Sequence, residues 1–215
     1  MNIPAKPNPD PATRLAPRIT ELRARLEGIE PGVLAARTGS EFGGDDHRSN
    51  EFHLLLWGKP VSLTYPSFIA LDPATRQELR PDQLTLLLYY FSAADGTPET
   101  GQWISFADLP DGRFYNQAFQ GYTGHELVKA IGSDQPAFER AAASLDGRPY
   151  PQGDAAFIFR ALPYMALLVI FWQGDEDFPA SYQILFDASA SHYLPTDACA
   201  ILGSTLTHRL IKACS

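Results

Sequence analysis

The sequence predicts an α+β fold, with a mainly antiparallel sheet covered by helices in a single domain. Helical and strand-like stretches do not alternate regularly, which disfavours a parallel sheet built from βαβ units. Two pairs of apolar stretches flank short turns, as in antiparallel hairpins. The 215 residues are 45% hydrophobic and 12% aromatic, which is enough for one core without disulfides or metals.

The first elements follow from prolines and from helical spacing. Residues 1–17 carry five prolines and few apolar groups, so we expect a Pro-rich extended tail before a globular domain at 18–215. A helix is expected over 18–27, where the apolar residues share one face. Pro31 suits the first turn of a short second helix that ends at Gly39.

A hairpin and a buried helix come next. Polar, glycine-rich residues 43–50 predict a loop. The stretches Glu51–Trp57 and Pro60–Tyr65 surround a turn at Gly58 and predict a hairpin. A helix over 83–94 is apolar on nearly all sides, so it should be buried.

Residues 96–122 show no steady periodicity, which predicts an irregular segment of the kind that often carries function. Ser105 is expected to start a single helical turn within it. Six aromatic residues fall in this segment: Trp103, Phe106, Phe114, Tyr115, Phe119 and Tyr122. They would either line an apolar pocket for a flat organic ligand, with Asn116 and Gln117 as polar handles, or fill the core beneath the segment.

The last part of the chain predicts helices around a second hairpin. Thr123 and Glu126 have the spacing of a capping box and predict a helix that ends before Gly132. Ser133 is expected to cap the next helix. Apolar runs and turn residues predict the remaining elements: strands at 155–162, 165–173 and 182–186, with the second at the centre of the sheet, and a final helix from Thr196 to about 213.

Composition limits the classes of partner. This acidic protein has a net charge of −8 and a pI of about 5.0, so we reject nucleic acid as the main partner. The longest apolar run is too short to span a bilayer, and the N-terminus lacks the apolar core of a signal peptide. Cys199 and Cys214 lie too far apart on one expected helix to form a disulfide, which favours a reducing compartment. We therefore expect a cytoplasmic protein without membrane contacts, whose oligomeric state the sequence does not predict.

Residues 174–197 hold the densest polar chemistry. Asp187 and His192 follow the strand at 182–186, and a carboxylate with an imidazole can bind a divalent metal or act as an acid and base pair. Alternatively, Asp187 and Ser189 satisfy backbone amides of an ordinary loop. The motifs GxSxG, GxxxxGK[ST], GxGxxG and CxxC do not occur, so the usual evidence for serine hydrolases, P-loop proteins, dinucleotide-binding dehydrogenases and thioredoxin-like enzymes is missing.

Two blocks carry a family resemblance: QWISFADLPDGRFYNQAF at 102–119 and WQGDEDFPASYQILFDASASHYLPTD at 172–197. The Leu-rich helix that ends in ADGTP, just before the first block, also fits. Over residues 30–212 the chain resembles a bacterial and archaeal family known as domain of unknown function 3786. The resemblance implies no activity, but some relatives are joined to iron–sulfur modules or occur in anaerobes that use corrinoid chemistry. The present sequence lacks the cysteine clusters of an iron–sulfur site.

Three functional hypotheses follow. The leading one is a non-catalytic accessory domain that binds an organic or metal-containing cofactor, such as a tetrapyrrole or corrinoid, between 102–122 and 187–195. The expected ligand-binding residues are Trp103, Phe106, Tyr115, Asp187, Ser189, His192 and Tyr193, with His192 and Asp187 as metal ligands. The second is a metal-assisted or acid–base hydrolase in which His192 is the base and Asp187 orients it. The third is a protein–protein adaptor that uses the Pro-rich tail and the acidic surface.

Overall fold

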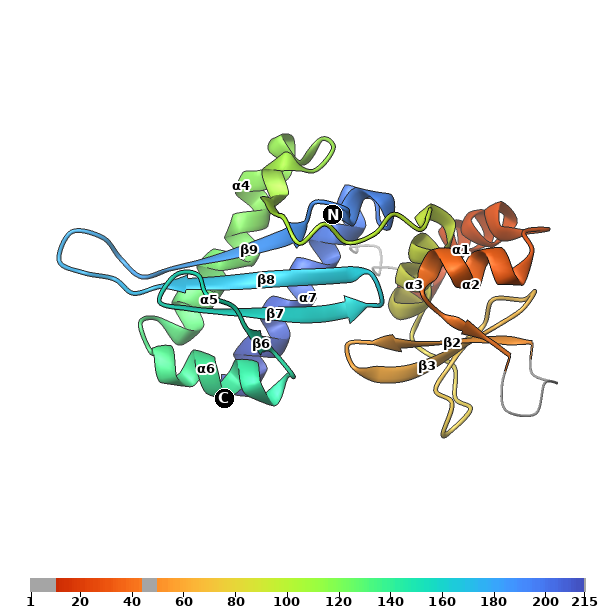
Figure 1. Ribbon diagram of the computed structural model, residues 1–215, viewed down its shortest axis with the longest axis horizontal. Coiled ribbons are helices and arrows are strands. Elements are labelled where there is room, and N and C mark those ends of the chain that lie inside the picture. Colours follow the sequence, from red (N-terminus) through yellow and green to blue (C-terminus); the bar gives the residue numbers. More distant parts are fainter. Residues whose placement is uncertain (1–10, 44–49, 215) are drawn as a thin grey trace, which may run out of the picture.

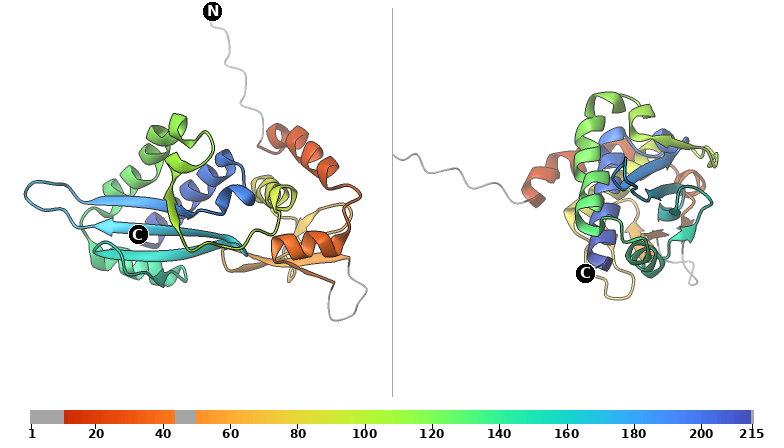
Figure 2. Two further views of the ribbon diagram at one scale, coloured as in Figure 1. Left: turned by 45° about the horizontal axis from the view of Figure 1, so that its top comes forward. Right: turned by 90° about the vertical axis from the view of Figure 1, so that its left-hand side faces the viewer.

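The structure is a computed structural model that describes residues 11–43 and 50–214. In this part of the chain, helices accompany two antiparallel sheets, one of four strands and one of five (Figure 1). The predicted α+β class is therefore confirmed. We call the four-stranded sheet and its helices the first lobe, and the five-stranded sheet and its helices the second lobe. The two lobes lie next to each other along the long axis of the molecule (Figures 1 and 2).

The sheet of the first lobe has the order β1-β2-β3-β4. Its strands are β1 (Glu41–Phe42), β2 (Glu51–Leu56), β3 (Lys59–Thr64) and β4 (Ala70–Leu71). Strands β2 and β3 form the predicted hairpin. The turn residues Trp57 and Gly58 both have positive φ, of 52° and 74°, as in the type I′ turns that match the twist of hairpin strands. The predicted loop at 43–50 falls almost entirely outside the described residues.

Three helices belong to the first lobe: α1 (Pro11–Leu26), α2 (Pro31–Thr38) and α3 (Pro81–Ala93). Helix α3 covers the inner face of the sheet, where the ring of Phe91 lies 4.9 Å from that of Phe52. Helix α1 packs on α3, and the guanidinium of Arg18 donates a hydrogen bond to the hydroxyl of Tyr89 at 2.8 Å. The apolar residues of α1 are buried in this contact, as their helical spacing predicts.

The first helix begins earlier than predicted. Residues 11–17, expected in the extended tail, form the first turns of α1, and residues 1–10 lie outside the described chain. Pro11 occupies the first helical position, where a missing N–H costs nothing. Pro17 removes one hydrogen bond within the helix, and the packing of α1 on α3 outweighs this loss.

The sheet of the second lobe has the order β5-β9-β8-β7-β6. Its strands are β5 (Trp103–Ser105), β6 (Arg148–Pro149), β7 (Ala155–Leu162), β8 (Met165–Trp172) and β9 (Ser181–Asp187). Strand β8 lies at the centre and is buried on both faces, as predicted. One face of the sheet is covered by four helices (Figure 2): α4 (Gly112–Tyr122), α5 (Gly124–Ile131), α6 (Gln135–Ser144) and α7 (Thr196–Cys214).

The segment 96–122 is more regular than predicted. It contains β5, the 3-10 helix η1 (Phe106–Asp108) and α4. Helix η1 follows Ser105, as predicted, and the backbone N–H and hydroxyl of Ser105 donate to the carboxylate of Asp108. Strand β5 is too short to show an alternating pattern, and α4 carries rings on its exposed side, so neither element has a clear period in the sequence.

Two predicted helix caps are wrong. The hydroxyl of Thr123 donates to the carbonyl oxygen of Phe119, so this side chain belongs to the end of α4 and does not cap α5. At the start of α6 the side chain of Asp134, and not that of Ser133, accepts the hydrogen bond from the backbone N–H of Ala137. At α5, Thr123 is the N-cap residue, but its hydroxyl is engaged by α4. At α6, the equally suitable Asp134 lies one residue after Ser133 and takes the cap.

Most buried side chains of the two lobes form one continuous cluster, and a smaller cluster lies on the opposite face of the second sheet. Tyr90 of α3 stands at the junction: its hydroxyl donates to the carbonyl oxygen of Thr38 at 2.7 Å and accepts from the backbone N–H of Tyr164 at 3.1 Å. The backbone N–H of Trp57 donates to the carbonyl oxygen of Ala161 at 2.8 Å. The boundary of a single domain at 18–215 stays a prediction.

Helix α7, of 19 residues, is the longest helix in the described chain. It carries both cysteines, which are free: Cys199 is buried and Cys214 is half-buried. Burial raises the pKa of the Cys199 thiol to about 12, as for a thiol that packs in the core. Within residues 11–43 and 50–214, no helix combines the length and the apolar character needed to cross a membrane.

Candidate functional site

A groove of about 920 Å³ lies between α4 and the first turns of α7. Its walls come from residues 106–122 on one side and from 191–204 on the other. The two stretches that the sequence marks as a site therefore face each other across an open hollow. We call this hollow the α4–α7 groove.

The close approach of α4 and α7 depends on two local contacts. The hydroxyl of Thr196, at the start of α7, donates to the carbonyl oxygen of Pro110 in the loop before α4 at 2.6 Å. Further along α7, a Cβ on Gly203 would lie 2.6 Å from the ring of Phe119. A residue with a side chain at position 203 would push that ring away, so the absence of a side chain there lets the two helices meet.

Aromatic and aliphatic side chains form the walls of the groove. Phe106 lines its floor and stacks on the fully buried Phe119, with ring centroids 4.2 Å apart and planes inclined by 8°. Tyr115 and Ile201 stand on the walls with 64% and 53% of their surface exposed. Large apolar side chains that remain this exposed on facing helices are a usual sign of a binding surface.

The polar groups of the groove are acidic or neutral. They are Asp111, Ser191, Thr196, Asp197 and Ser204. No lysine or arginine is among the described residues that line it. The groove therefore favours a ligand that brings hydrogen-bond donors or positive charge to its rim.

Asp187 accepts backbone amides, as the alternative interpretation of the sequence predicts, and some of these amides come from distant residues 100–101. Its buried carboxylate accepts hydrogen bonds from the backbone N–H and hydroxyl of Thr100, both at 3.0 Å, and from the backbone N–H of Gly101 at 2.7 Å. The backbone N–H and hydroxyl of Ser189 donate to it at 2.9 and 2.7 Å. Burial raises the pKa of Asp187, but these hydrogen bonds outweigh burial, so its pKa lies below the ordinary value. The carboxylate thus fastens residues 100–101 to the end of β9.

His192 pairs with a different carboxylate. Its Nδ1 lies 2.7 Å from Oδ2 of Asp95 and 3.2 Å from the hydroxyl of Thr97. The hydrogen bond with His192 first, and then those from the hydroxyl and backbone N–H of Thr97, lower the pKa of Asp95 to about 2. The side chains of Asp95 and His192 are about half exposed. Among the described residues, no group of three or more His, Cys, Asp or Glu side chains is placed to hold a metal ion.

The remaining predicted ligand residues lie away from the groove. Trp103 pairs with Asp187 in the register of β5 and β9, and its ring contacts Tyr150 on the sheet face opposite the helices. The Nε1 of Trp103 is buried without a hydrogen-bond partner in the described chain. Tyr193 is fully buried between Tyr90 and Tyr164, and burial raises its pKa to about 12. Only Phe106 and Tyr115 of the predicted set line the groove.

Sequence reasoning missed the contribution of α7. Five residues of α7 line the groove: Thr196, Asp197, Ala200, Ile201 and Ser204. One signal was available: Ile201 lies outside the buried stripe of α7, which includes Ala198, Leu202 and Leu206. An isoleucine off the buried face of a helix indicates a second contact surface.

Comparison with known proteins places the chain in a family. No curated protein and no solved structure matches the chain significantly. The model of a family described as a domain of unknown function matches residues 30–209, which is most of the chain and includes both walls of the α4–α7 groove. The chain therefore belongs to this family, DUF3786.

Proposed function

We propose that this protein is a non-catalytic accessory domain that binds a flat organic molecule in the α4–α7 groove. The observation that supports the proposal most directly is the groove itself, with a volume of about 920 Å³ and exposed rings on its walls. Pockets for organic ligands are typically about 300–1,000 Å³, mostly apolar, with a few polar groups that orient the ligand. The carboxylates of Asp111 and Asp197 are such groups.

The lining narrows the class of ligand. Tyr115 and Tyr122 offer ring surfaces for a flat apolar body, while the acidic groups suit hydrogen-bond donors at its edge. Tetrapyrroles, including corrinoids, are one class with this shape. The described residues of the lining include no His, Cys or Met, so the protein would hold such a macrocycle by its faces and edges and not through an axial metal ligand.

A titration with two probes tests this proposal. Thioflavin T is a flat cation and cobinamide is a corrinoid, and we expect at least one to bind, seen by fluorescence or absorption. Ala118 lies on the groove wall and is exposed, so Ala118→Trp fills the groove without disturbing the core. This variant should weaken binding at least about tenfold, or about 1.4 kcal/mol.

The matched control is Phe114→Ala on the same helix. Phe114 is 84% exposed and does not line the groove, so this variant should bind the probe as the wild type does. Binding that is unchanged in Ala118→Trp, or no binding of either probe to the wild type, would contradict the proposal.

The other expectations remain proposals of lower support. The hydrolase hypothesis requires Asp187 to orient His192, whereas the carboxylate beside His192 belongs to Asp95. The tail of the adaptor hypothesis lies within residues 1–10 and the start of α1, mostly outside the described chain. We also propose a cytoplasmic setting without nucleic-acid partners, supported by the two free cysteines and the net charge of −8.

A further inference from the structure

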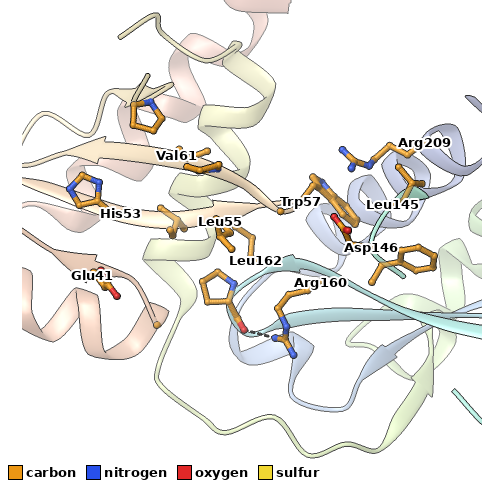
Figure 3. Close-up of a pocket in the computed structure, with 17 residues that line it drawn as sticks. Glu41, His53, Leu55, Trp57, Val61, Leu145, Asp146, Arg160, Leu162 and Arg209 are labelled. Carbon is orange, nitrogen blue, oxygen red and sulfur yellow. Dashed lines mark hydrogen bonds between the residues drawn. The ribbon is translucent and has the colours of Figure 1, made fainter. Parts of the chain in front are cut away.

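A second cavity, of about 500 Å³, lies between the two lobes (Figure 3). We call it the interlobe cavity. The β2–β3 hairpin forms one side with His53, Leu55 and Trp57. The second lobe forms the other side with the β7–β8 turn, the end of α6 and the last turns of α7. It shares no lining residue with the α4–α7 groove.

Arg209 of α7 reaches one end of this cavity, beside Trp57 and Asp146 (Figure 3). Its guanidinium carbon lies 5.3 Å from the centroid of the Trp57 ring, in a cation–π contact. The Nε atom is buried and has no hydrogen-bond partner in the described chain. No ion pair of Arg209 occurs among the described residues either, and the neighbouring Asp146 acts on it only at longer range.

Arg160, the second arginine that lines the cavity, has hydrogen-bond partners for its guanidinium within the protein. Arg160 makes a two-pronged contact with the carboxylate of Glu99, at 2.8 and 3.0 Å, and a further hydrogen bond to the carbonyl oxygen of Pro163. Its charge is therefore compensated within the protein. Arg209 is half-buried and has no such carboxylate contact in the described chain, and burial lowers its pKa.

An anion bound to Arg209 would compensate the positive charge of its guanidinium. A carboxylate can accept charge-assisted hydrogen bonds from a guanidinium. The Nε atom of Arg209 is itself buried, so such a contact would use the Nη groups. Between Arg209 and the far end at Glu41 and His53, the cavity is walled by Leu55 and Leu162 (Figure 3). Leu55 is 52% exposed although it stands on a strand of the sheet. The cavity thus has Arg209, with Asp146 beside it, at one end and an apolar middle.

We propose that the interlobe cavity is a second binding site, for a small organic carboxylate. The carboxylate binds Arg209, and the apolar part of the ligand lies against Leu55 and Leu162. Such a ligand contacts both lobes at once, since Leu55 belongs to β2 and Arg209 to α7. The site is independent of the α4–α7 groove and of the function proposed for it.

Benzoate is a suitable probe, with benzyl alcohol as its uncharged counterpart. The protein has three tryptophans, whose indole N–H signals are resolved by ¹H–¹⁵N NMR and assigned with Trp57→Phe. Benzoate at millimolar concentration should shift the Trp57 signal and leave those of Trp103 and Trp172, which lie in the second lobe, unchanged. Benzyl alcohol should shift none of them.

Two variants of Arg209 complete the test. Arg209→Gln should abolish the benzoate shift, and Arg209→Lys, which keeps the charge but loses the two-pronged geometry, should weaken binding about tenfold. If Arg209→Gln does not fold, as judged by its near-UV circular dichroism, Arg209→Lys alone decides. Benzoate binding that is equal in wild type and the folded variants, equal binding of benzyl alcohol, or no shift at Trp57 would overturn the proposal.

Discussion

Replacement of Asp187 by asparagine is expected to lower the free energy of unfolding by about 3 kcal/mol. The native carboxylate accepts hydrogen bonds from Thr100, Gly101 and Ser189, all with donors that are fixed in place by the fold. An asparagine at this position turns an NH₂ group toward some of these donors and leaves them buried without an acceptor. Urea denaturation followed by circular dichroism measures the loss.

Asp72→Asn is the matched control for this variant. Asp72 also accepts two backbone N–H groups, those of Ala74 and Thr75, but its turn is exposed to solvent. Water can replace a lost partner there, so we expect a change below about 1 kcal/mol. Similar losses in Asp72→Asn and Asp187→Asn would show that burial of Asp187 contributes little.

The effect of Asp187→Asn should also depend on pH. The folded protein holds the pKa of Asp187 below its ordinary value, so the carboxylate stabilises the fold fully above the unfolded pKa of about 4. This contribution is lost as the pH falls through the folded pKa. The difference in unfolding free energy between wild type and Asp187→Asn should therefore narrow below about pH 4. A difference that is constant from neutral to acidic pH would contradict this.

The variant Phe119→Ala is expected to destabilise the protein by about 3–5 kcal/mol and to weaken ligand binding in the α4–α7 groove. Phe119 is fully buried, stacks on Phe106 and lies edge-on to Tyr122. Its removal leaves a cavity beneath both groove residues, which then lose their support. Thermal and urea denaturation measure the stability, and the thioflavin T and cobinamide titrations measure binding.

Phe114→Ala provides the control on the same helix. Because Phe114 is 84% exposed, its truncation should change stability by no more than about 0.5 kcal/mol. If Phe119→Ala loses stability but binds the probe as tightly as the wild type, the Phe106–Phe119 stack does not shape the groove.

Elements with a local signature were predictable from the sequence. The β2–β3 hairpin follows from apolar stretches around Gly58, and β8 from an apolar run that has the composition of a central strand. The start of α1 was not predictable in this way. Its residues 11–17 have the composition of a proline-rich tail, and they continue a helix whose later residues pack against α3, which is distant in sequence.

The candidate site was predictable in position but not in detail. Segments 102–122 and 187–195 do meet, as expected, through the pairing of β5 with β9. Side chains alternate between the two faces of β5, a strand of only three residues. This alternation places Trp103 on the sheet face opposite the helices and away from the groove. The contact of Asp187 with Thr100 and Gly101 was hidden for a related reason, because these residues approach it only after β5 and β9 have paired.

The longest helix has a part in both hollows. Ile201 and Arg209 belong to the same continuous helix α7, eight positions apart, or about 12 Å along its axis. Ile201 lines the α4–α7 groove, and Arg209 lines the interlobe cavity. A regular helix of this length is stiff. A tilt of α7 that widens the α4–α7 groove therefore also changes the shape of the interlobe cavity.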